Sequence, residues 1–218
     1  MRIILFFVSF LLLSSMLFAG DTSVLRPPSG AKVAIFEFED LQCPDCARAE
    51  PVVKQAVNTY KIPWLRHDFP LPMHNWSFQA AVWTRWFDAN KSKAMGDELR
   101  EFIYQNQASI NPDNLRQYID EFAAEKKVEL PFAPDPSGVL AEKINSDKAL
   151  GQRVGIQHTP TIYVVSNTKI GTPFVEVVDR SKLYELIDQM KQQATEEPSP
   201  AATKKTGSDK KKPPAKKT

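Results

Sequence analysis

The chain has 218 residues, 42% of them hydrophobic, and a formal net charge of +2. Seven lysines and three acidic residues lie beyond residue 195, and Arg2 lies in the first segment, so the body from about 21 to 195 carries −3. A nucleic-acid-binding domain needs a basic face, which this body does not offer, so we expect no nucleic-acid partner. About 175 residues are enough for one domain with its own core.

The first twenty residues are typical of a secretory signal peptide. Arg2 precedes an almost unbroken apolar run over 3–13, which leads to small residues around Ala19 and Gly20. The run is shorter than the roughly 18 to 20 residues that cross a bilayer, so an uncleaved membrane anchor is the lesser interpretation. We therefore expect a secreted protein, periplasmic or otherwise extracytoplasmic, in a compartment that permits disulfides.

Residues 32–38 are mostly apolar and predict a buried strand, which leads to the only two cysteines, Cys43 and Cys46, at the start of a helix. Unpaired N–H groups and the helix dipole favour a thiolate there. A structural disulfide is a poor explanation, because closing so short a loop stabilises little. A soft-metal site would lack a second pair of cysteine ligands. The pair therefore predicts a reversible dithiol/disulfide couple, with no metal and no cofactor.

The helix continues to about Tyr60, with Pro51 in its interior, where a proline removes one hydrogen bond and kinks the axis. A second strand is predicted at 64–69. From about 74 to 153 the apolar residues recur at helical spacing, which predicts a block of four helices. These helices are expected at 77–89, 95–105, 112–124 and 137–154.

After this block, a third strand is predicted at 161–165, a fourth at 174–178 and a last helix at 181–193. Strands and helices thus occur both before and after the helical block. This order predicts an α/β protein in which one sheet has helices on both faces. Residues 196–218 are rich in Lys and Pro and cannot bury a core, so they predict a disordered tail. Such a tail is a spacer, or a weak tether to anionic lipid or cell-wall polymer.

The order of these features resembles the DsbA-like branch of the thioredoxin superfamily over about residues 30–193. The features are Cys-Pro-Asp-Cys after a strand, a proline within the next helix, a helical block, and Thr159-Pro160 before the third strand. The resemblance implies a thioredoxin-like fold with an inserted helical subdomain at about 74–153, within a domain spanning 21–195.

The resemblance also assigns roles to residues of the site. It implies that Cys43 is the exposed attacking cysteine and Cys46 the buried resolving one. Pro160 matches the cis-proline that lies opposite the sulfurs, and Glu37 matches a buried acid that relays a proton for the resolving cysteine. The residues expected to tune the redox potential or to contact substrate are Pro44, Asp45, Thr159 and His158.

Asp45 departs from the family pattern, because the strongest oxidants carry histidine at this position. A carboxylate beside Cys43 should disfavour its thiolate. Since a stabilised reduced thiolate is what makes such a protein oxidising, we expect a milder oxidant.

These features together predict a secreted thiol:disulfide oxidoreductase that introduces or exchanges disulfides in client proteins with free or mispaired cysteines. The resemblance implies that a membrane quinone-linked partner of the DsbB or vitamin-K-epoxide-reductase type reoxidises the dithiol. One alternative is a thiol reductase or isomerase. Another is a non-enzymatic metal-binding or chaperone module on the same fold.

Overall fold

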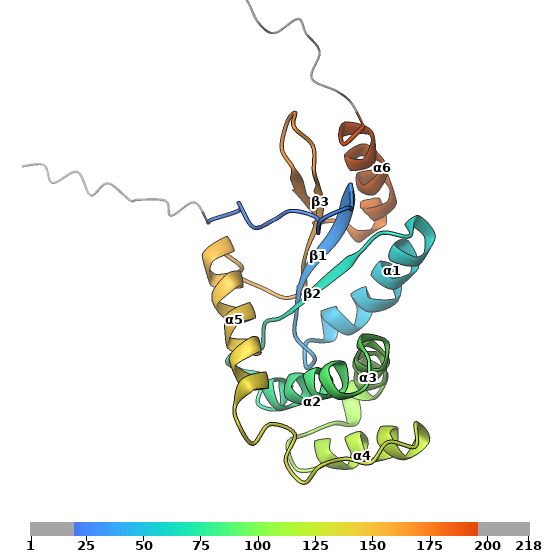
Figure 1. Cartoon of the computed structure of the whole chain (residues 1–218), viewed down its shortest axis with the longest axis vertical. Coiled ribbons are helices and arrows are strands. Elements are labelled where there is room, and N and C mark those ends of the chain that lie inside the picture. Colours follow the sequence, from blue (N-terminus) through green and yellow to red (C-terminus); the bar gives the residue numbers. More distant parts are fainter. Residues whose placement is uncertain (1–19, 196–218) are drawn as a thin grey trace, which may run out of the picture. The chain divides into compact units, whose positions relative to one another are not determined.

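The computed structural model describes residues 20–195, and Figure 1 labels its main elements. The tail at 196–218 and all of the predicted signal peptide except Gly20 lie outside the described residues. Every strand and helix predicted within the described part is present, with its ends within three residues of those expected. The elements are β1 Val33–Glu39, α1 Pro44–Tyr60, β2 Trp64–Asp68, α2 Ser77–Asn90, α3 Lys93–Asn106, α4 Leu115–Glu125, α5 Val139–Val154, β3 Thr161–Ser166, β4 Phe174–Glu176 and α6 Leu183–Gln193.

The internal contacts of the described chain fall into two compact units. The first, the helical unit, comprises 20–24, 38–50 and 66–161, and the second, the sheet unit, comprises 25–37, 51–65 and 162–195. The elements β1, α1 and β2 each begin in one unit and end in the other. Among the described residues, no helix combines the length and apolar character needed to cross a bilayer.

The strands form one sheet in the order β2-β1-β3-β4. β1 and β3 are buried along their whole lengths, which explains why their sequences are almost continuously apolar. β3 pairs with β4 in antiparallel register, with Tyr163 opposite Glu176. In the sheet unit, the hydroxyl of Tyr60 at the end of α1 donates to the carbonyl of Tyr184 in α6 at 3.2 Å.

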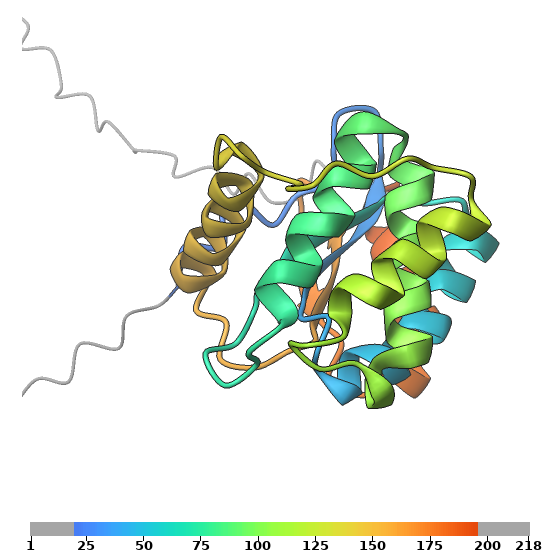
Figure 2. The same ribbon diagram turned by 90° about the horizontal axis from the view of Figure 1, so that it is seen from below.

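The core of the helical unit lies among α2, α3, α4 and α5. Figure 2 shows α2 and α3 side by side, and α2 packs against both α3 and α5. Aromatic rings fill this core edge to face, with centroids of Trp86 and Phe87 5.1 Å apart and those of Phe87 and Phe122 5.4 Å apart. Both cysteines belong to the same core, so the dithiol is packed against the helical block.

Candidate active site

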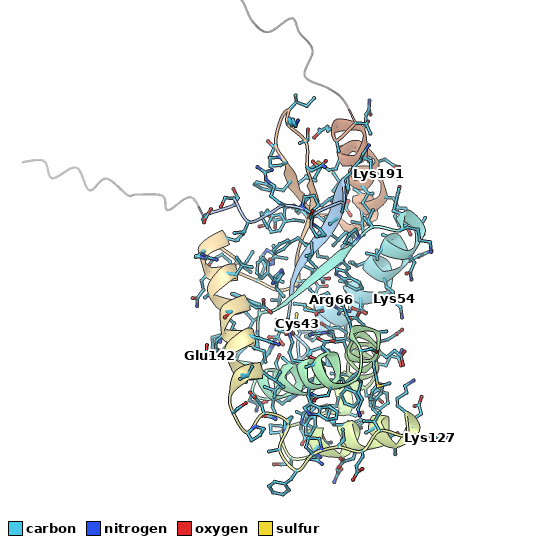
Figure 3. The ribbon with its side chains drawn as sticks, in the orientation of Figure 1. Cys43, Lys54, Arg66, Lys127, Glu142 and Lys191 are labelled. Carbon is cyan, nitrogen blue, oxygen red and sulfur yellow. The ribbon has the colours of Figure 1, made fainter. Side chains whose placement is uncertain are left out.

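The two cysteines lie at the start of α1, within the helical unit, in the dithiol form. Figure 3 labels Cys43 at the amino-terminal end of this helix. Cys43 is 7% exposed and Cys46 is 1% exposed. Cys43 is therefore buried rather than exposed as the resemblance implied, because residues of the helical unit pack against it, and it remains the more accessible of the two.

The surroundings of Cys43 stabilise its thiolate and lower its pKa to about 5. The largest cause is a hydrogen bond with the side chain of Cys46, which outweighs the opposing effect of burial. The backbone N–H groups of Cys46 and Asp45 lower the pKa further. This pKa agrees with the expectation that the first turn of a helix favours a thiolate.

The Thr159-Pro160 bond is cis, as the resemblance implied. The carbonyl oxygen of Thr159 lies 3.2 Å from the Sγ of Cys43 and accepts a hydrogen bond from it when the thiol is protonated. Both Thr159 and Pro160 are buried, whereas His158 is exposed. The hydroxyl of Thr161 donates to the carbonyl oxygen of His158 at 2.7 Å and lies 3.4 Å from its ring nitrogen Nδ1. Thr159 thus makes a direct hydrogen bond with the Cys43 sulfur, and the role of Pro160 stays a prediction.

The other predicted residues lie in different surroundings. Glu37 belongs to the sheet unit, where it is buried and its Oε2 accepts a hydrogen bond from Nε1 of Trp64 at 2.8 Å. Its role as a proton relay stays a prediction. Pro44 is exposed at the first position of α1. The carboxylate of Asp45 pairs with Arg48 at 3.2 Å. This pairing weakens the argument for a milder oxidant, since a cation partly neutralises the carboxylate beside the thiolate.

Polar side chains that sequence reasoning missed connect the loop before α1 with the helical block. Nε2 of Gln107 donates to the carbonyl oxygens of Leu41 at 2.7 Å and Cys43 at 3.1 Å. Oε1 of Gln42 accepts from the backbone N–H of Trp76 at 2.9 Å. Neither glutamine belongs to a periodic pattern, so only their partners in space identify them.

A second missed feature is a buried network of charges beginning at Glu39. Arg66, labelled in Figure 3, donates to both carboxylate oxygens of Glu39 at 2.8 and 2.5 Å, and to Glu50 at 2.7 Å. The hydroxyl of Tyr104 also donates to Glu39, at 2.9 Å. Burial opposes ionisation of Glu39, yet Arg66 and Arg100 outweigh it and lower the pKa of this carboxyl. A glutamate in an otherwise apolar strand was the available signal.

The network continues through Asp68. Arg100 donates to Asp68 at 2.6 Å and to Glu39 at 3.0 Å, and Arg85 donates to Asp68 at 2.5 Å. Burial would raise the pKa of Asp68, but Arg100 and Arg85 hold it at about 2. The network therefore connects the carboxyl-terminal ends of β1 and β2 with α2 and α3. The same end of β1 leads into the loop that carries Cys43.

Among the residues that the structure describes, no group of three or more His, Cys, Asp or Glu side chains could hold a metal ion. The dithiol, the threonine carbonyl and the helix start together can carry out thiol–disulfide exchange. A thiolate with a low pKa both attacks disulfides at neutral pH and leaves readily from a mixed disulfide.

Comparisons with known proteins agree with this geometry. A family model described as thioredoxin matches residues 22–189. Among curated proteins, the chain is 24% identical over 146 residues to the Na(+)/H(+) antiporter NhaA 3 of Salinispora tropica, a match covering 66% of this chain and 22% of that protein. It is 23% identical over 165 residues to NhaA 1 of Salinispora arenicola, covering 72% and 24%. The chain thus spans less than a quarter of the length of these relatives.

Solved structures show the same fold at low sequence identity. The alpha-DsbA1 of Wolbachia pipientis superposes with a TM-score of 0.61 at 19% identity, covering 78% of this chain and 90% of that chain. The thiol-disulfide exchange protein alpha-DsbA2 of the same organism gives 0.60 at 17%, covering 76% and 85%. A periplasmic thioredoxin-like protein from Salmonella enterica serovar Typhimurium gives 0.60 at 17%, covering 75% and 87%. The predicted DsbA-like α/β fold with a helical insertion is confirmed.

Proposed function

The chain belongs to the thioredoxin family, and on that basis we propose that it is a thiol:disulfide oxidoreductase that introduces or exchanges disulfides in client proteins. The observation that carries this proposal is the pair of free cysteines at the start of α1, with the Thr159 carbonyl 3.2 Å from Sγ of Cys43. The side chain of Cys46 lowers the pKa of Cys43 to about 5. Stabilising the reduced thiolate makes the disulfide form more oxidising. Two of the similar structures are a thiol-disulfide exchange protein and a periplasmic thioredoxin-like protein.

The exchange follows from the positions of the two sulfurs. A client thiolate attacks Sγ of Cys43 in the oxidised protein, the bond between Cys43 and Cys46 breaks, and Cys46 leaves as a thiolate. A second client thiolate then attacks the client sulfur of the mixed disulfide, and Cys43 leaves. The client dithiol is thereby oxidised to a disulfide, while the cysteine pair is reduced to a dithiol. The low pKa of Cys43 favours its departure in the second step.

Residues around the sulfurs take supporting roles in this proposal. The Thr159 carbonyl lies beside Cys43 and directly precedes Pro160, and this segment would meet the backbone of an extended client. Glu37 would relay the proton of Cys46. Reoxidation of the dithiol would come from a membrane quinone-linked partner of the DsbB or vitamin-K-epoxide-reductase type, as the resemblance implies.

Secretion forms part of the same proposal, supported by the charged, apolar and small-residue order of the first twenty residues. A fusion of this chain to a reporter enzyme that is active only outside the cytoplasm should show reporter activity. Mass spectrometry of the exported protein should find a new amino terminus near residue 20. A reporter that stays inactive, with an intact amino terminus, would contradict export.

The activity is tested by mixing the oxidised protein with a reduced dithiol peptide and following peptide oxidation. The wild type should oxidise the peptide, and Cys43→Ser should abolish the reaction. Cys46→Ser, when charged at Cys43 with a small disulfide, should accumulate a mixed disulfide with a matched peptide that carries a single cysteine, because no second thiol is present to resolve it. Ser109→Ala, an exposed serine in the same unit, serves as the control. Activity that persists in Cys43→Ser would refute the proposal, and one tightly bound metal per dithiol would favour the metal-binding alternative.

A further inference from the structure

Asp40, which directly precedes the cysteine loop, has a fully buried carboxylate that accepts hydrogen bonds from four donors. Oδ1 accepts from the backbone N–H of Gln42 at 2.8 Å and from the hydroxyl of Ser77. Oδ2 accepts from the backbone N–H of Leu71 at 2.7 Å. Nδ1 of His74 lies 2.6 Å from the same oxygen and donates to it when it carries the proton. The side chain therefore joins three separate segments of the helical unit.

The backbone of Asp40 reaches both cysteines. Its N–H donates to Sγ of Cys46 at 3.4 Å, a hydrogen bond within the range for sulfur. Its carbonyl oxygen accepts from the N–H of Cys43 at 3.0 Å. A single residue thus connects the resolving sulfur, the nucleophile's backbone and the helical block.

We propose that Asp40 is a positioning residue for thiol exchange, whose carboxylate holds its own backbone N–H against Cys46 so that the Cys46 thiol is directed at Cys43. A sulfur that accepts a hydrogen bond from this N–H keeps its own S–H available as a donor. The hydrogen bond with the Cys46 side chain is the largest cause of the lowered pKa of Cys43. Asp40 therefore acts on the nucleophile through Cys46. The inference deepens the proposed function and rests on it for its role in catalysis.

A carboxylate is required at this position because its donors approach both oxygens. The N–H groups of Gln42 and Leu71 donate to different carboxylate oxygens, and a backbone N–H cannot act as an acceptor instead. An asparagine has one oxygen and one amide group, so it would leave one of these two donors without an acceptor. A buried donor without a partner is costly, and the loop would shift to relieve it.

The test is the titration of the Cys43 thiolate by its ultraviolet absorbance in reduced Asp40→Asn. The pKa of Cys43 should rise by about one unit, a tenfold change in the thiolate equilibrium. Asp120→Asn makes the same chemical change at an exposed site, where Asp120 pairs with Arg116, and should leave the pKa unchanged. A folded Asp40→Asn that melts lower but titrates like the wild type would overturn the proposal, because that result describes a merely structural residue.

A second pair of variants keeps the proposal testable should Asp40→Asn fail to fold. His74→Phe retains a ring but removes one donor to Asp40, and should raise the pKa of Cys43 by less than Asp40→Asn does. His74→Gln retains an amide donor and should restore the value of the wild type. Equal pKa values in the Phe and Gln variants would overturn the proposal.

The titration needs no client, so it separates this inference from the proposed function. A wild type that oxidises no dithiol peptide, combined with a raised pKa in Asp40→Asn, would refute the function and support the positioning role. A wild type that is active, combined with an unchanged pKa in the folded variant, would refute the positioning role alone.

Discussion

The carbonyl oxygen of Thr159 lies 3.2 Å from the sulfur of Cys43, although 116 positions separate the two residues in the sequence. This contact brings the segment before β3 to the start of α1. Cys43 is 7% exposed, whereas Cys46 is enclosed at 1% exposure. The difference in access and the low pKa of Cys43 lead to the first prediction.

Cys43 alone should be alkylated when the reduced protein is treated briefly with iodoacetamide. The thiolate is the reactive form, and the pKa of Cys43 is lowered to about 5, so labelling should be fast at pH 7 and slow as the pH falls through about 5. Peptide mass mapping at several pH values measures both effects. Equal labelling of Cys46 would contradict the order of attack.

Replacing Asp45 with histidine should lower the pKa of Cys43 and make the disulfide more oxidising. The change removes a negative charge near the thiolate and can add a positive one at the helix start. Arg48 already pairs with Asp45 at 3.2 Å, and the Asp45 side chain is 38% exposed, so screening limits the effect. We expect at most about one pKa unit, or roughly 30 mV in the two-electron couple.

Equilibration with glutathione measures the potential, and thiolate absorbance measures the pKa. Asp45→Asn is the matched control, because it removes the negative charge without adding a positive one and should give part of the shift. A potential that stays constant, or becomes more reducing, in Asp45→His would remove Asp45 from the set of tuning residues.

The pair between Arg100 and Asp68 should contribute strongly to stability. Both side chains are 2% exposed, and Arg100 also donates to Glu39. Replacing Arg100 with methionine leaves two buried carboxylates with fewer partners, which costs about 3–5 kcal/mol. Lys93→Met, which breaks an exposed pair with Asp97, should cost less than about 1 kcal/mol. Urea unfolding compares the three proteins, and similar losses in both variants would contradict the prediction.

Stability should also fall at acid pH through Asp68. Its folded-state pKa of about 2 lies below the ordinary value of 3.8, so its stabilisation is complete above about pH 4 and is lost as the pH falls towards 2. The shift corresponds to about 2 kcal/mol. Urea unfolding of the wild type and of Asp68→Asn at pH 7, 4 and 2 measures it. The variant should show the smaller loss between pH 4 and 2, and parallel losses would show that other groups cause the acid sensitivity.

Much of the fold could be predicted because its signals are local. The apolar run of β1 next to the cysteine pair, and the 3.6-residue spacing in α2 to α5, each depend on neighbouring residues. The largest error at any predicted end is three residues, at the start of α4, which begins at Leu115. Irregular turns precede this helix, and periodicity does not locate the residue at which a turn becomes a helix.

The burial of Cys43 could not be predicted in this way. Its exposed fraction depends on the helical block and on Thr159, none of which is near it in sequence. The pairing of Asp45 with Arg48 is local by contrast, because side chains three positions apart on a helix are neighbours, so the sequence already held its signal.

The sequence by itself determined the chemistry of this protein, a cysteine pair at the start of a helix after a buried strand, because that arrangement is built within eleven consecutive residues, 36–46. Only the tertiary structure decided how the pair is held. Asp40 meets Ser77 across 37 positions, Gln107 meets Leu41 across 66, and Arg100 meets Glu39 across 61. Buried polar groups must find partners wherever packing places them, and such partners leave no periodic trace in the sequence.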